Sequence, residues 1–324
     1  MMATQWQDRA AFSPKDLSGP PDPLTKARKL GPTVTDIETR ISNLPLWRGR
    51  PGIAPLVGGL SNLSFTVTDA SGKYVVRITR DFPFHHVYRD REVMSARAAH
   101  AAGFAPEIVH AEPGLMVSRW IEGKVFGPAD IRANIPRMAE LLRRFHHDMQ
   151  ARVSGAGFIF WAFHVNRDYL LTLERDGHAD AAARKKWSAI NSELEAAQAP
   201  LPIVFGHHDL LPANLIDDGK RLWLIDYEYA GFGTAMFDLA NLSSNSGFSS
   251  EDSAQLLTGY FGDVSDDLLR SHGAMACASL LREALWSLVS AIHLKAPGAD
   301  YAAYAEENFA RLDTALAAWR ERFR

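Results

Sequence analysis

The feature that most constrains this chain is the stretch FGHHDLLPANLIDDGKRLWLIDYEYAG, residues 205–231. Two β-rich runs flank Asp218-Gly219, a dipeptide that favours tight hairpin turns. Because a hairpin brings the outer ends of its strands together, the loop that carries Asp209 and Asn214 should lie beside Asp226. Pro212 stiffens that loop by fixing its φ angle. The sequence therefore predicts that two carboxylates and an amide meet at one end of a short hairpin.

These residue types suit phosphoryl transfer. A carboxylate can accept the proton of an attacking hydroxyl, while an amide oxygen and a second carboxylate are suitable ligands for Mg²⁺. We therefore expect Asp209, Asn214 and Asp226 to form the centre of an active site.

Composition narrows the class of protein. Among 324 residues, 35 are basic and 38 acidic, a balance that disfavours binding to a nucleic-acid backbone. Cys277 is the only cysteine and lies in the apolar run GAMACASLL, so we expect a buried small side chain rather than a disulfide or a thiolate zinc site.

No membrane partner is expected. The N-terminus has charges and prolines where a signal peptide needs an apolar core, and the apolar run 280–294 contains Arg282, Glu283 and His293. We therefore expect a cytoplasmic protein.

The order of predicted elements indicates two lobes. Residues 1–32, rich in proline, read as a flexible extension. Strand patterns over 63–68 and 74–79, a helix over 89–102 and two further short strands predict a small β-rich lobe over 33–120. Helical periodicity dominates 121–324.

The motif HHDLLPAN has the H-x-D-x-x-x-x-N spacing of a kinase catalytic loop, and LIDYEYAG supplies a strand-borne aspartate downstream. With the continuation FDLAN, the chain resembles the choline/ethanolamine kinase family of the aminoglycoside-phosphotransferase-like fold over about residues 50–315. The resemblance implies an α+β, two-lobed, protein-kinase-like fold with a small antiparallel-sheet N-lobe and a larger, mainly helical C-lobe.

The resemblance also implies residue roles in an ATP- and Mg²⁺-dependent enzyme. Asp209 would be the catalytic base, and Asn214 and Asp226 the Mg²⁺ ligands. Asp238 would brace the catalytic loop, and His207 would hold that loop rather than carry protons.

A nucleotide site is expected in the small lobe. Glycine allows backbone amides to approach phosphate, so the GGLSN turn is a candidate through Gly58, Gly59, Ser61 and Asn62. Arg77 stands where kinases place a phosphate-binding lysine, and Glu92 on the next helix would orient it; the alternative is that both are solvated surface charges. By the resemblance, backbone groups near Ser118 to Trp120 would hydrogen-bond adenine.

Candidates for binding the acceptor are Tyr229, Glu283 and Trp286, because aromatic faces and a carboxylate attract an ammonium group. By the resemblance, Glu283 stands where the family often has a second tryptophan. Tyr301 and Tyr304 are further candidates. Simple helix packing is the alternative for Trp286, Tyr301 and Tyr304.

The expected function is transfer of the γ-phosphate of ATP to the hydroxyl of choline, ethanolamine or a related amino alcohol. Another small-molecule acceptor, an aminoglycoside or thiamine, stays open, as does a catalytically silent nucleotide- or amine-binding protein. A protein kinase is disfavoured because only residues 227–237 separate Asp226 from Asp238, too few for a long activation loop.

Overall fold

A computed structural model describes residues 34–56, 62–296 and 298–323. The chain divides into two compact units, residues 1–47 and 48–324. In the smaller unit, helix α1 runs Val34–Ser42 and the Trp47 indole donates a hydrogen bond of 2.6 Å to the Ile41 carbonyl. The predicted extension over 1–32 lies outside the described residues, and the predicted lobe boundary at residue 120 stays a prediction.

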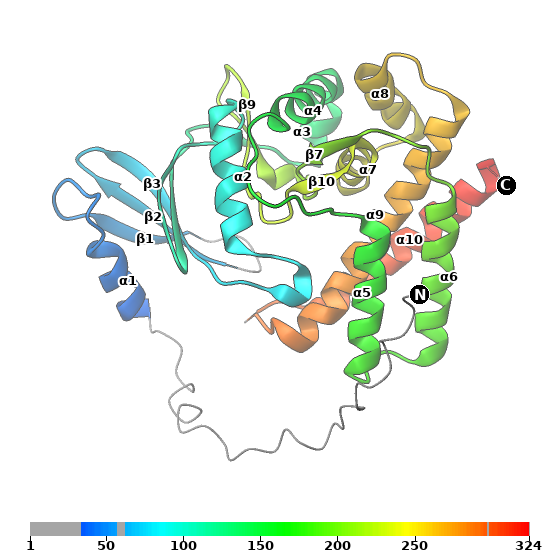
Figure 1. The fold of residues 1–324 in the computed structure, drawn as a ribbon, viewed down its shortest axis with the longest axis horizontal. Helices are drawn as coiled ribbons and strands as arrows, with labels where there is room; N and C mark the ends of the chain where they lie inside the picture. The colour runs from blue at the N-terminus through cyan, green and yellow to red at the C-terminus, as the bar shows by residue number, and fades with distance from the viewer. Residues whose placement is uncertain (1–33, 57–61, 297, 324) are drawn as a thin grey trace, which may run out of the picture. The chain divides into compact units, whose positions relative to one another are not determined.

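The larger unit begins with an antiparallel sheet of five strands in the order β1-β2-β3-β5-β4 (Figure 1). Its strands are β1 (Gly52–Leu56), β2 (Leu63–Asp69), β3 (Gly72–Ile78), β4 (Ile108–Glu112) and β5 (Leu115–Arg119). The predicted β2–β3 hairpin is confirmed. Its turn is held by the Asp69 carboxylate, which accepts hydrogen bonds from the amides of Ser71 and Gly72 at 2.8 and 3.2 Å.

The alternation of side chains along β3 determines the direction of Arg77. Tyr74 and Val76 are buried on one face of the strand, so Arg77 is directed to the other face. Helix α2 (Arg89–Ala101) follows the short 3₁₀ helix η2 (Pro83–His85) and buries Glu92 in its first turn. Strand β3 therefore supplies the positive charge of Arg77, and helix α2 supplies the negative charge of Glu92.

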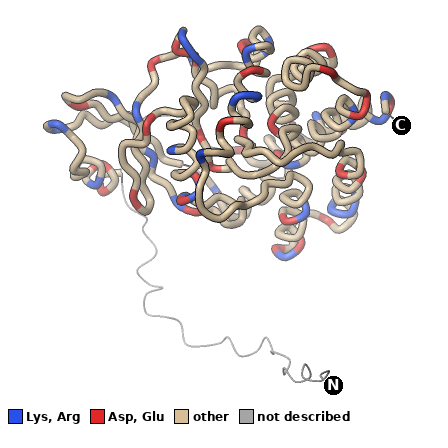
Figure 2. Tube along the Cα trace, turned by 45° about the horizontal axis from the view of Figure 1, so that its top comes forward, with Lys and Arg blue, Asp and Glu red and all other residues tan. Residues whose placement is uncertain are grey.

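The remainder of the larger unit is mainly helical. Its helices are α3 (Pro128–Arg132), α4 (Ile135–Met149), α5 (Ala162–Arg175), α6 (Ala181–Ala196), α7 (Ala235–Ser246), α8 (Ser250–Phe261), α9 (Asp266–His293) and α10 (Tyr301–Phe323). The predicted α+β architecture, a small antiparallel sheet followed by a larger helical part, is confirmed. Figure 2 shows acidic and basic residues interspersed along this unit rather than gathered by sign.

Helix α9 forms the centre of the helical part. It packs against α10, α7, α5 and α6, and Cys277 is buried on it as expected. By length and composition α9 could cross a membrane, but 72% of its most apolar window is buried inside the protein, as in the core helix of a globular domain. Within it, Arg282 and Glu283 are both buried.

Short strands surround the predicted catalytic loop. They are β6 (Lys124–Val125), β7 (Ile203–Gly206), β8 (Leu215–Asp217), β9 (Leu222–Leu224) and β10 (Gly231–Thr234), and the 3₁₀ helix η3 (Pro212–Asn214) precedes β8. The predicted turn at Asp218-Gly219 joins β8 to β9. Strands β7 and β10 pair with Gly206 opposite Gly231.

Glycine at 206 leaves room for the buried ring of His208. A Cβ built at Gly206 would clash with His208 Nε2, and one at Gly233 would lie 2.9 Å from the same atom. The ring is enclosed further by Phe160, which stacks on it with 4.4 Å between ring centroids. The two glycines therefore permit the packing that fixes the start of the catalytic loop.

We predict that Gly206→Ala lowers the free energy of unfolding by about 1 to 3 kcal/mol, because an added methyl group overpacks a closed site. Chemical denaturation measures the change. Gly52→Ala is the control, since a Cβ at this strand glycine meets only Thr68 O at 3.7 Å, an ordinary contact. Equal stability of the two variants would contradict the packing role of Gly206.

Candidate functional site

A cavity of about 540 Å³ in the larger unit brings most of the predicted site residues together. Both the sheet and the helical part line it. The predicted residues in its walls are Asn62, Arg77, Glu92, Ser118, Trp120, Asp209, Asn214, Asp226, Tyr229, Glu283 and Trp286. Gly58, Gly59 and Ser61 lie outside the described residues, and their phosphate-binding role stays a prediction.

The catalytic loop is anchored by Asp238, which is fully buried at the start of α7. Its carboxylate accepts hydrogen bonds from the backbone amides of His207 and His208 at 2.8 and 2.7 Å, and lies 2.8 Å from Nε2 of His146. One turn later, Asn241 accepts a hydrogen bond from the amide of Leu210 at 2.7 Å. The loop backbone is therefore fixed on both sides of Asp209.

The surroundings of Asp238 stabilise its ionised form. Burial by itself would raise its pKa, but the hydrogen bond from His146 and the neighbouring His208, His146 and His207 outweigh it and hold the pKa well below 3.8. His207 is buried beside this carboxylate, and its Nε2 lies 3.0 Å from the Ile225 carbonyl. Both residues are buried and neither lines the cavity, as expected for groups that position the loop.

Asp209 projects from this anchored loop into the cavity. Nδ2 of Asn214 donates to its backbone carbonyl at 2.9 Å and to its Oδ2 at 3.3 Å. Burial raises the pKa of Asp209 well above its usual value; Arg282 opposes this rise, whereas Glu283 and Asp226 add to it. A carboxylate with a raised pKa is a stronger base.

Asn214 and Asp226 offer oxygens suited to Mg²⁺. Nδ2 of Asn214 is directed to Asp209, which leaves the amide oxygen for a cation. Oδ1 of Asp226 is buried and lies 3.0 Å from Arg77 Nη1 as an ion pair, without a hydrogen bond of good geometry. No cluster of three His, Cys, Asp or Glu suited to a metal occurs in the described part of the chain. One or two protein ligands are typical of Mg²⁺ sites in which substrate phosphates complete the coordination.

Asp226 also adopts a left-handed backbone conformation, with φ at 68°. Such conformations are uncommon for residues other than glycine and persist where the surroundings enforce them, often in functional sites. His208, on the facing loop, shares this property with φ at 62°. Left-handed backbone conformations thus occur in the catalytic loop and directly after the hairpin.

The predicted pair of Arg77 and Glu92 is present, with Nη1 and Oε1 at 2.7 Å and side-chain exposures of 14% and 2%. The alternative of two solvated surface charges is therefore wrong. Arg77 also contacts Asp226, so the same guanidinium links the nucleotide side of the cavity to a candidate metal ligand.

Two members of this charge cluster, Arg89 and Glu228, were not predicted from the sequence. Glu228 Oε2 lies 2.8 Å from Arg89 Nη1 and 3.7 Å from Arg77 Nη2, and Arg89 contacts Glu92 at 2.6 Å. Burial and the nearby Asp226 raise the pKa of Glu228 to about 7 despite these arginines. The spacing of Glu228, two residues after Asp226 in IDYEYAG, was the available signal.

On the nucleotide side, several predicted groups already have protein partners. Asn62 accepts a hydrogen bond from Arg89 at 3.0 Å. The amides of Arg119 and Trp120 donate to the carbonyls of Glu107 and Lys73. An adenine ring near Ser118 to Trp120 would therefore have to use carbonyl groups or the backbone of Ile121, which also lines the cavity.

At the opposite end, helices α9 and α10 form an aromatic and acidic wall. Trp286 Nε1 donates to the Tyr229 hydroxyl at 3.0 Å, and the Tyr304 hydroxyl donates to Glu283 Oε2 at 3.1 Å. Tyr304 lines the cavity and Tyr301 does not, although both rings pack edge-on against Trp286.

Arg282 is a further residue that sequence reasoning missed as part of the site. It is 2% exposed, lines the cavity and contacts Glu283 Oε1 at 2.6 Å. Its guanidinium also lies over the Tyr229 ring, 4.5 Å from the centroid. The available signal was its position next to Glu283 in an otherwise apolar run.

We predict that Asp238→Asn lowers both the melting temperature and turnover, because it removes the charge that anchors the amides of His207 and His208. The loss of unfolding free energy should be on the order of 3 kcal/mol near neutral pH. A depressed folded-state pKa stabilises above the unfolded value, so the wild-type advantage should shrink as pH falls below about 4. Denaturation at several pH values checks this, and a pH-independent difference would contradict it.

The chain is similar in sequence to known proteins. The protein LicA of Haemophilus influenzae is 26% identical over 212 residues, covering 63% of this chain and 61% of LicA. Mouse ethanolamine kinase 2 is 29% identical over 163 residues, 48% of this chain and 42% of that protein. The aligned regions thus span less than two thirds of either relative.

Among solved structures, a choline/ethanolamine kinase family protein from Mesorhizobium loti is 28% identical with a TM-score of 0.70, covering 87% of this chain and 94% of the other. This similarity confirms the kinase-like α+β fold. The model of the phosphotransferase enzyme family matches residues 52–276, which include Arg77, Asp209, Asn214 and Asp226. The chain belongs to the phosphotransferase enzyme family.

Proposed function

We propose that the protein transfers the γ-phosphate of ATP to the hydroxyl of choline, ethanolamine or a related amino alcohol, with Mg²⁺ bound at Asn214 and Asp226. One observation carries this proposal. A single cavity holds a positioned carboxylate, Asp209, together with the Asn214 and Asp226 pair and the wall formed by Glu283 and Trp286. The relatives named as ethanolamine kinase and choline/ethanolamine kinase family protein support the same acceptor class.

In the proposed reaction, the acceptor hydroxyl oxygen attacks the γ-phosphorus as the bond to the β–γ bridging oxygen breaks. The hydroxyl proton passes to Asp209, whose raised pKa favours its acceptance. Asn214 holds the Asp209 side chain in place through its amide. Because the base must be ionised beforehand, turnover should fall as the pH drops through the raised pKa.

The nucleotide would be held from the side of the sheet. Arg77, fixed by Glu92, presents a guanidinium to the phosphates, and guanidinium groups bind phosphate oxygens in a bidentate manner. Bound Mg²⁺ would neutralise charge on the phosphates. Asn214 and Asp226 supply the protein oxygens for it.

Charge at the acceptor end favours a cation. Asp209 and Glu283 carry two negative charges when ionised and Arg282 carries one positive charge, which leaves a net charge of −1 beside Trp286 and Tyr304. One ammonium group balances this charge. A ring face and a carboxylate together suit an amino alcohol.

An aminoglycoside, thiamine, or nucleotide binding without catalysis are the competing functions. A coupled assay for ADP release over choline, ethanolamine, thiamine and aminoglycosides decides among them. We expect release with an amino alcohol and dependence on added Mg²⁺. Release with only another acceptor would overturn the substrate, and no release with any acceptor would overturn the activity.

Asp209→Asn should lower kcat by roughly 10² to 10⁴, the range for a positioned base, while nucleotide affinity changes little. Steady-state kinetics and nucleotide titration measure the two effects. The variant keeps the side-chain volume, so a melting curve like that of the wild type serves as the control. Near-normal turnover would contradict the assignment of the base.

Trp286→Ala should raise KM for choline by about 5- to 30-fold, the range of a desolvated cation–π contact. The effect on ethanolamine should be smaller, because its ammonium can hydrogen-bond to Glu283. Glu283→Gln should penalise ethanolamine more than choline. Kinetics with both acceptors on both variants test the pair of predictions, and unchanged KM values for Trp286→Ala would assign this residue to core packing.

A further inference from the structure

A second cavity, of about 310 Å³, lies beside the proposed active site and has no role in it. It is formed by the segment from η2 into α2, the segment before α5, and α5 itself. Tyr229 belongs to the walls of both cavities. The volume falls at the lower end of the range for small-molecule sites.

Arg91 is held in this cavity with most of its donors unused. Its guanidinium lies over the Phe158 ring at 3.6 Å and over the Tyr88 ring at 4.6 Å from the centroids. Nη2 donates to the His86 carbonyl at 2.6 Å. In the described part of the chain no carboxylate lies within ion-pair distance of Arg91, and its other N–H groups make no hydrogen bond. A guanidinium fixed by ring contacts with a free N–H edge suits bidentate binding of an oxyanion.

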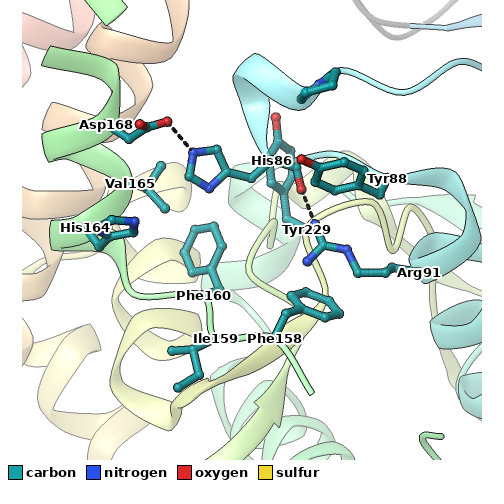
Figure 3. A pocket seen from close by; sticks show the side chains of 11 residues that line it. His86, Tyr88, Arg91, Phe158, Ile159, Phe160, His164, Val165, Asp168 and Tyr229 are labelled. Atoms are coloured by element: carbon teal, nitrogen blue, oxygen red, sulfur yellow. Dashed lines mark hydrogen bonds and ion pairs between the residues drawn. The ribbon is translucent and has the colours of Figure 1, made fainter. Parts of the chain in front are cut away.

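Asp168 provides the opposite charge in the same cavity. Its Oδ2 lies 2.8 Å from His86 Nε2, while Oδ1 has no hydrogen bond among the described residues. Its side chain is 36% exposed. Figure 3 shows Arg91 and Asp168 on opposite sides of the cavity, with Phe160 and Tyr229 between them.

We propose that this cavity binds a small zwitterion, with its oxyanion at Arg91 and its ammonium at Asp168. The oxyanion is a carboxylate or a phosphate monoester, since both match the guanidinium edge. The rings of Phe160 and Tyr229 face the short linker between the two charges. Asp168 disfavours a polyanion such as a nucleoside triphosphate, which separates this cavity from the nucleotide site.

Ligand-observed NMR titration of the full chain with β-alanine and with O-phosphoethanolamine tests the proposal. β-Alanine has no hydroxyl, so its binding does not depend on the proposed phosphotransfer. The two probes distinguish a carboxylate from a phosphate, and ethanolamine is the probe without an oxyanion. We expect at least one zwitterion to bind, and Arg91→Ala to raise its Kd about tenfold or more, as for loss of a charged hydrogen bond.

Arg97→Ala is the matched control, because Arg97 is exposed on the same helix and does not line the cavity. It should leave every Kd unchanged, and Arg91→Ala should leave the affinity for ethanolamine unchanged. If Arg91→Ala does not fold, Arg91→Lys, which keeps the charge but loses the planar edge, should weaken binding of the zwitterion.

Asp168→Asn should weaken the binding of β-alanine but not that of acetate, because acetate carries only the oxyanion. The proposal would be overturned if the wild type binds neither zwitterion. It would also be overturned if wild type and Arg91→Ala have equal Kd values, or if the Arg91 and Arg97 variants lose affinity equally. ADP release by Arg91→Ala, expected to match that of the wild type, is measured separately, so failure of the proposed activity is distinguishable.

Discussion

The buried charge of Asp238 is the interaction on which the active-site geometry depends. One carboxylate receives two consecutive backbone amides of the catalytic loop and contacts the ring of His146 on α4. It therefore ties three separate segments, α4, α7 and the loop after β7, to one point. A charge buried at this depth is stable only with all its partners in place, so the loop conformation and the packing of α7 are interdependent.

A second constraint comes from the cluster of Arg77, Arg89, Glu92, Asp226 and Glu228, which joins the sheet and α2 to the hairpin that follows the catalytic loop. The cluster contains three acidic and two basic groups, and burial together with the nearby Asp226 raises the pKa of Glu228 to about 7. A cation bound at Asp226 would relieve this excess of negative charge. The candidate metal site and the orientation of Arg77, the candidate phosphate-binding arginine, are therefore electrostatically linked.

Tyr229 connects two regions of different chemistry. On one side its hydroxyl accepts a hydrogen bond from Trp286 in the proposed acceptor wall. On the other it lines the cavity that contains Arg91 and Asp168. Because Tyr229 belongs to the walls of both cavities, packing around it affects both of them.

The sequence by itself determined the fold class and the candidate catalytic centre, because both depend on local patterns. Strand alternation directed Arg77 away from the buried face, and the turn at Asp218-Gly219 with the spacing of Asp209, Asn214 and Asp226 brought those three side chains together. Only the tertiary structure decided which distant charges join them. Arg89 meets Glu228, and Arg282 meets the Tyr229 ring, through packing between elements far apart in the chain. Contacts over such distances leave no periodic signal in the sequence. The cavity of Arg91 and Asp168 could not be predicted for the same reason, because its walls come from α2, α5 and the segment after the catalytic hairpin.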